Sequence, residues 1–147
     1  MFKTILVPVD LAEPEVSSPA LKRAVALGAI TDANIVLVYV RSILPVTFME
    51  YVPPSFDEEQ QSDAEKKLAE IAAALTFPKE RVSSVVRMGS VYNEVLAEAA
   101  KQKADLIVIG SHHPGMATYL LGSNASTIVR HADCSVLVVR EPEAPAA

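Results

Sequence analysis

Two patterns of apolar and polar positions alternate along the chain. Short apolar runs rich in β-branched residues recur at Thr4–Val9, Ile35–Val40, Val82–Val86, Leu106–Ile109 and Ser135–Val139. Four of these runs are continuously apolar, as expected for central strands that are covered on both faces. The run at 82–86 is more polar, and this composition favours a strand at the edge of a sheet.

The segments between these runs carry apolar residues at helical spacing. The predicted helices are Pro19–Ile30, Asp63–Leu75, Val91–Ala100 and Ser123–His131. Ser17 and Ser18 precede the first helix as candidate caps, and Ser90 precedes the third. Regular alternation of strand and helix predicts an α/β fold. We expect a single doubly wound, mostly parallel five-stranded sheet with strand order 3-2-1-4-5 and helices on both faces.

Composition narrows the class of protein. The chain has 147 residues, the size of one domain, and a net charge of −5 with no basic run, which argues against a nucleic-acid partner. Cys134 is the only cysteine, so no internal disulfide is possible. No apolar run approaches the roughly 20 residues of a membrane span. We therefore expect a cytoplasmic protein without a membrane partner, with its domain at 1–140 and a disordered Pro/Ala-rich tail at 141–147.

Polar residues follow the first and fourth predicted strands. The first strand ends at Pro8-Val9-Asp10 and the fourth at Gly110-Ser111-His112. In open α/β sheets, ligands bind beyond the carboxyl ends of the strands where the winding direction reverses, which here lies between these two strands. An ionised Asp10 can accept hydrogen bonds from sugar hydroxyls, or it can cap the loop or helix that follows. The backbone of Val40, at the end of the second strand, can pair with the edge of a base.

The entry to the last helix has the composition of a phosphate site. Gly122-Ser123-Asn124 precedes an amphipathic segment. The free N–H groups and positive dipole end of a helix attract anions, and glycine allows close approach to the backbone. No glycine follows the first strand and no Gly-Lys-Ser/Thr occurs, so the dinucleotide fingerprint and the P-loop are both absent.

Three stretches together resemble the universal stress proteins, and specifically their small F/G-type branch. They are KTILVPVD, TYLLGSNAS and VRHADCSVLVVR, and the resemblance covers nearly the whole chain. It implies an adenine nucleotide alpha hydrolase-like fold and ATP as the ligand, with Mg²⁺ or Mn²⁺ left open. By matched position, adenine and ribose would meet Pro8, Val9, Asp10 and the backbone of Val40, and ribose and phosphates would meet Gly110, Gly122, Ser123 and Asn124. Ser111, His112 and His113 lie in the same loop.

The resemblance also implies a function and an assembly. Family members pair their last strand, here 134–140, antiparallel with its copy, which predicts a homodimer. Our first hypothesis is a dimeric, ATP-dependent sensor or adaptor in the stress response, with a protein partner that the sequence does not identify. No residue set assembles a general base, a nucleophile and a metal site, so we expect slow ATP hydrolysis at most.

Two other functions stay open. ATP-binding members have a G-x2-G-x9-G-[ST] loop, in which His113 here replaces the second glycine. That replacement favours a stress protein without nucleotide, working by protein contact through the 41–56 loop and the dimer surface. A weaker hypothesis is an enzyme acting on a phosphorylated small molecule. We interpret Arg87 and Arg130 as members of surface ion pairs, although either can reach a phosphate, and Cys134 as a buried thiol.

Overall fold

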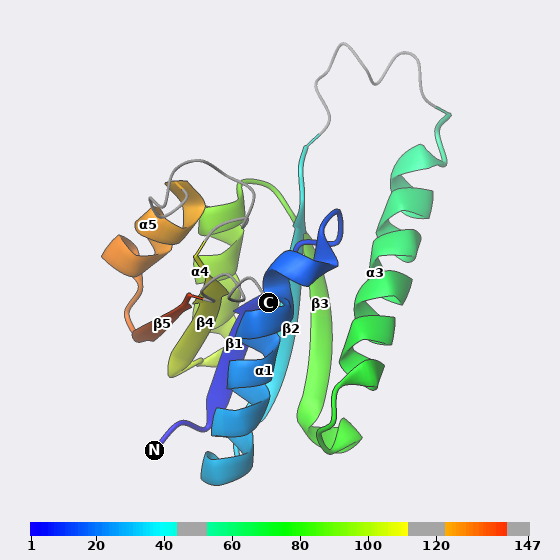
Figure 1. Cartoon of the computed structure of the whole chain (residues 1–147). Helices are drawn as coiled ribbons and strands as arrows, with labels where there is room; N and C mark the ends of the chain where they lie inside the picture. Colours follow the sequence, from blue (N-terminus) through cyan, green and yellow to red (C-terminus); the bar gives the residue numbers. More distant parts are fainter. Residues whose placement is uncertain (44–52, 112–122, 141–147) are drawn as a thin grey trace, which may run out of the picture.

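Parallel strands form a single sheet in the order β3-β2-β1-β4-β5 in the computed structural model, which describes residues 1–43, 53–111 and 123–140. Helices cover both faces of this sheet (Figure 1). The strands are β1 (Thr4–Pro8), β2 (Asn34–Arg41), β3 (Val82–Met88), β4 (Leu106–Gly110) and β5 (Ser135–Val139). The helices are α1 (Pro14–Thr31), α3 (Phe56–Ala74), α4 (Val91–Gln102) and α5 (Ser123–His131), with a short 3₁₀ turn at Lys79–Arg81. The predicted fold class, the strand order and the edge position of the polar strand are confirmed.

Two helices begin earlier than their apolar periodicity predicts. Helix α1 begins at Pro14, a position favourable to proline, and Pro19 lies inside it. The prediction that Ser17 or Ser18 caps this helix is wrong, because both lie within the helix, where Ser17 is buried. Helix α3 begins at Phe56, and its solvent-facing first turn carries three acidic residues where the helix dipole favours them. Ser90 occupies the predicted cap position of α4 but makes no side-chain capping bond.

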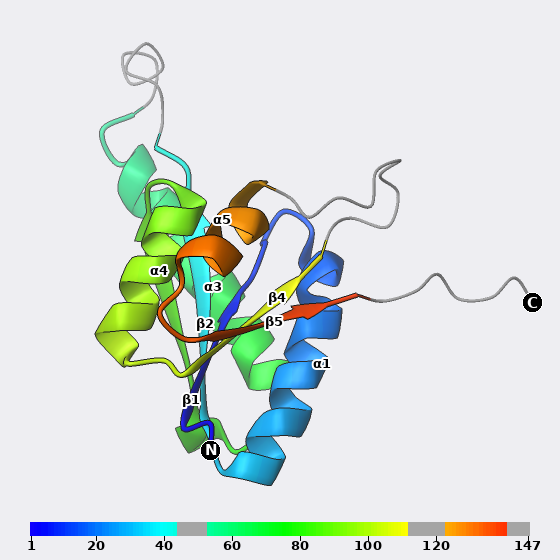
Figure 2. The same ribbon diagram turned by 90° about the vertical axis from the view of Figure 1, so that its left-hand side faces the viewer.

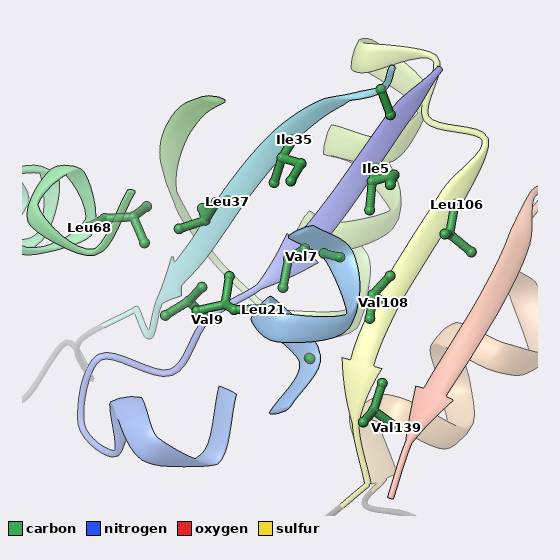
Figure 3. Packing of buried hydrophobic residues seen from close by; sticks show 13 residues of the cluster. Ile5, Val7, Val9, Leu21, Ile35, Leu37, Leu68, Leu106, Val108 and Val139 are labelled. Atoms are coloured by element: carbon green, nitrogen blue, oxygen red, sulfur yellow. The ribbon is translucent and has the colours of Figure 1, made fainter. Parts of the chain in front are cut away.

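The sheet separates two hydrophobic layers. One lies between the sheet and helices α1 and α3, and the other lies between the sheet and helices α4 and α5 (Figure 2). Alternate strand residues supply the layers, so Ile5 and Val7 face α1 while Leu6 faces α4. Side chains of β1, β2, β4 and β5 meet those of α1 and α3 in the first layer (Figure 3). None of the helices in the described ranges combines the length and apolar character needed to cross a membrane.

Candidate functional site

The two central strands part toward their carboxyl ends. Strand β1 pairs with β2 as far as Pro8, and β4 pairs with β5 as far as Gly110. Strands β1 and β4, however, pair with each other only as far as Leu6 and Ile107. This is the point at which the winding direction of the sheet reverses. We refer to the region between the unpaired carboxyl ends of β1 and β4, where the sequence predicts the site, as the crevice.

Asp10 follows the end of β1 and is exposed. Its Oδ1 accepts a hydrogen bond from the Ala12 N–H at 2.9 Å, and its own N–H donates to Ser17 Oγ at 3.0 Å. The interpretation of Asp10 as a cap for the following loop thus holds for Oδ1. Among the described residues, Oδ2 has no protein partner. One carboxylate oxygen can therefore serve a ligand while the other holds the turn.

The backbone of Val40 faces the end of β1. Successive residues of a strand direct their N–H and C=O groups alternately toward the two neighbouring strands. Val38 C=O faces β1 and accepts from the Val9 N–H at 2.8 Å, whereas Arg41 C=O faces β3 and accepts from the Gly89 N–H at 2.9 Å. Val40 therefore directs its N–H and C=O to the β1 side, beyond the last residue of β1 that pairs with β2. Within the described ranges, no backbone group of the β1 segment bonds to them.

Gly110 ends β4 against the first turns of α1. A Cβ at this position would lie 3.1 Å from the Val16 carbonyl oxygen, so the glycine permits a close approach of the two backbones. The next residue, Ser111, continues toward β5 and donates its N–H to Val139 C=O at 3.0 Å. The predicted site residues His112, His113 and Gly122 lie outside the described residues.

Helix α5 begins with two exposed polar residues, Ser123 and Asn124. Its first turn contains no acidic residue, and its last turn contains Arg130 and His131. Both features match the helix dipole, so the amino end of α5 keeps its attraction for an anion. The end of β4 and the start of α5 lie at the same end of the sheet (Figure 2). The described residues of the predicted site thus lie at the same end of the sheet, the one formed by the carboxyl ends of the strands.

The two arginines with more than one interpretation have different surroundings. Arg87 Nε bonds Glu94 at 2.9 Å, and Arg87 Nη1 bonds Glu98 at 2.8 Å. The hydrogen bond to Glu98 raises the pKa of the Arg87 guanidinium above its usual range, and burial partly opposes the rise. The predicted ion pair is confirmed, although it is partly buried because Glu98 is fully buried. Arg130 is exposed on α5.

Sequence reasoning missed a cavity of about 360 Å³ beside the crevice. It lies between the loop after β1, the end of β2 and the first half of α3, with Leu11, Tyr39 and Phe56 among its lining residues. Arg41 also lines it, and this buried side chain bonds Asp57 at 2.8 Å and Gln61 at 2.9 Å. No local pattern identifies Arg41, because its partners lie on another element. The 41–56 loop predicted as a contact surface has residues 44–52 outside the described ranges.

Comparison with known proteins agrees with this geometry. The chain has the adenine nucleotide alpha hydrolase-like α/β fold. The model of the universal stress protein family matches residues 1–140. Universal stress protein G of Escherichia coli O157:H7 is 41% identical over 143 residues, which cover 95% of this chain and 100% of the relative. The chain therefore belongs to the universal stress protein family.

Solved structures share the fold. The hypothetical protein MJ0577 superposes with a TM-score of 0.79 at 24% identity, covering 98% of this chain and 99% of its own. A universal stress protein solved in complex with cAMP superposes with a TM-score of 0.66 at 22% identity, covering 94% and 97%. At these identities the likeness establishes the architecture of the chain.

Proposed function

We propose that this protein binds an adenine nucleotide, ATP, in the crevice between β1 and β4. In this proposal the protein acts in the cytoplasm as a dimeric, nucleotide-dependent sensor or adaptor in the stress response. The observation that carries the proposal is the direction of the Val40 backbone, whose N–H and C=O face the space beyond the last residue of β1 that pairs with β2.

The Val40 backbone matches adenine in its hydrogen-bonding pattern. Adenine presents an acceptor at N1 beside a donor at the exocyclic N6, and a neighbouring N–H and C=O complement that pair. Guanine presents a donor at N1 beside an acceptor at O6. The same backbone would then set its N–H against the N1–H donor and its C=O against the O6 acceptor, and neither pair could form a hydrogen bond. A buried polar site of this kind discriminates strongly, because the wrong base leaves its polar groups unpaired. We therefore expect ATP to be preferred over GTP.

The rest of the nucleotide follows from the positions around the base. Asp10 Oδ2 would accept from a ribose hydroxyl, with Pro8 and Val9 beneath the sugar. The phosphates would lie between Gly110 and the first turn of α5, where Ser123 and Asn124 begin the helix. Mg²⁺ or Mn²⁺ would neutralise part of the phosphate charge, since hard cations bind phosphate oxygens. The loop residues Ser111, His112, His113 and Gly122 complete the proposed phosphate site.

Two further considerations support a binding role. A universal stress protein of the same fold was crystallised with cAMP, so this architecture accommodates an adenine nucleotide. Among the described residues, no second titratable side chain hydrogen-bonds to the Asp10 carboxylate, so no acid–base pair is assembled around it. We propose that nucleotide occupancy carries the signal and that hydrolysis, where it occurs, is slow.

The dimer of this proposal forms through β5, the outermost strand beside β4. Val139 C=O faces β4, so the alternating residues Val136 and Val138 direct their backbone groups outward. An exposed strand edge pairs readily with a second strand, and a two-fold axis would pair β5 with its own copy. Such pairing would join two sheets into one continuous sheet.

Titration calorimetry tests the nucleotide site. The protein is purified without added nucleotide, unfolded, and any released small molecule is identified by mass spectrometry; the refolded protein is then titrated with ATP, AMP and GTP. We expect ATP to bind, GTP to bind at least about tenfold more weakly, and Asp10→Ala to lose ATP affinity. Glu15→Ala is the matched control, because it removes a nearby exposed carboxylate from α1. Equal affinities for ATP and GTP, or an unchanged Asp10→Ala affinity, would contradict the proposal.

A further inference from the structure

The parting of β1 and β4 depends on where the backbone donors of β1 point. Val9 N–H bonds Val38 of β2, and Thr4 C=O accepts the Asp105 N–H from the β4 side. Because direction alternates along a strand, positions 4, 6, 8 and 10 direct their backbone groups toward β4. Continued pairing of the two strands therefore needs N–H donors at positions 8 and 10.

Neither donor is available. Position 8 is Pro8, and proline has no N–H. The pairing register, Leu6 opposite Ile107, places the carbonyl of Val108 as the acceptor that an N–H at position 8 would reach. The observed pairing of β1 with β4 stops immediately before this point, although β1 still pairs with β2 at Pro8.

The second donor, the N–H at position 10, bonds to a residue of helix α1. The Asp10 N–H, which would otherwise turn toward β4, donates instead to Ser17 Oγ at 3.0 Å. Ser17 is only 6% exposed, so its hydroxyl is a fixed part of the interior. Its neighbour Val16 places a carbonyl oxygen close to Gly110 on the opposite wall. One turn of α1 thus contacts both sides of the crevice.

We propose that Pro8 and Ser17 are positioning residues that hold β1 and β4 apart and so keep the nucleotide crevice open. Pro8 removes one ladder bond by its chemistry, and Ser17 diverts the next. This role rests on the proposed nucleotide function for its purpose, but the strand separation itself is measurable without any ligand. It also accounts for a proline at a strand end where β1 remains paired with β2.

The test restores the missing donors. Pro8→Ala introduces an N–H at position 8, and Ser17→Ala releases the Asp10 N–H. The matched controls are Pro78→Ala, a proline before the 3₁₀ turn and outside the sheet, and Ser18→Ala, the neighbour of Ser17 in α1. Hydrogen exchange and NMR coupling across hydrogen bonds report whether the new amide bonds to Val108. Calorimetry reports ATP affinity, and thermal unfolding reports stability.

We expect the amide introduced at position 8 to be protected from exchange and coupled to the Val108 carbonyl. We also expect Pro8→Ala and Ser17→Ala to weaken ATP binding by about tenfold or more, with melting temperatures no lower than those of the controls. Pro8→Val, which favours a strand, provides a second variant if Pro8→Ala folds poorly. A freely exchanging amide at position 8, or wild-type affinity in both variants, overturns the role of Pro8 and Ser17. A wild-type protein that binds no adenine nucleotide overturns the proposed function instead, and the exchange result still decides whether these residues part the strands.

Discussion

The carboxylate of Asp105 holds the start of β1 through the backbone of Thr4. Asp105 Oδ1 accepts the Thr4 N–H at 3.0 Å, and the Asp105 N–H donates in return to Thr4 C=O at 3.1 Å. The second oxygen, Oδ2, accepts the Lys3 N–H at 2.8 Å. These bonds fasten β1 to β4 at the end opposite the crevice. The two strands are thus closed at one end and parted at the other.

Replacement of Asp105 should loosen this closed end. Asp105→Ala leaves the N–H groups of Lys3 and Thr4 without their carboxylate, and hydrogen bonds to a charged group contribute about 1.5–3 kcal/mol each. Because Lys3 is exposed and water replaces part of the loss, we expect a fall of about 2 kcal/mol in the free energy of unfolding. Urea denaturation measures it, with Asp133→Ala as the control. A loss no larger than that of the control would show that water replaces both bonds.

The buried Glu98 should depend on its arginine. Glu98 is 0% exposed and bonds both Arg87 and Gln102. Arg87→Met leaves a buried carboxylate without its cation, which typically costs about 3–5 kcal/mol of stability. The double variant Arg87→Met with Glu98→Met removes both charges and should recover most of this loss. Chemical denaturation of the four proteins in this cycle gives the coupling, and additive effects would be inconsistent with a direct pair.

The thiol of Cys134 should react slowly. Burial raises the pKa of Cys134 above its ordinary value, and the negative charges of Asp105 and Asp133 raise it further. A raised thiol pKa lowers the thiolate fraction at neutral pH, and the thiolate is the nucleophile. We expect iodoacetamide to alkylate the folded protein more slowly than the unfolded protein near pH 7.5, with the rate rising as pH increases. Equal rates with and without denaturant would indicate an accessible, unperturbed thiol.

The outer edge of β5 should control assembly. Val136→Pro removes an N–H that faces away from β4, and proline is tolerated on the free edge of a sheet. We expect this variant to keep its fold, as judged by circular dichroism, and to sediment as a monomer, while Val136→Thr sediments as a dimer. The proposed dimer would be wrong if the wild-type protein sediments as a monomer, and its route through β5 would be wrong if Val136→Pro stays dimeric.

The sequence by itself determined the layered α/β architecture and the end of the sheet at which the candidate site lies. Continuous apolar runs and helical periodicity are local signals, and the handedness of parallel crossovers leaves few ways to order such strands. The pattern correctly predicts that Val82–Val86 lies at an edge and brings Asp10 and Gly110 to the same end of the sheet. It misplaces the start of α1, because proline is typical of a helix start and two prolines compete for that role.

Only the tertiary structure decided which hydrogen bonds hold the strands on either side of the crevice. Asp105 and Thr4 are 101 residues apart, and no local pattern links a carboxylate to a backbone N–H at that distance. Ser17 reads as a helix cap in the sequence because serine favours caps, yet the fold buries it against the Asp10 backbone. Hydrophobic periodicity specifies which face of an element is buried, whereas a hydrogen bond depends on which atoms the folded chain brings within reach.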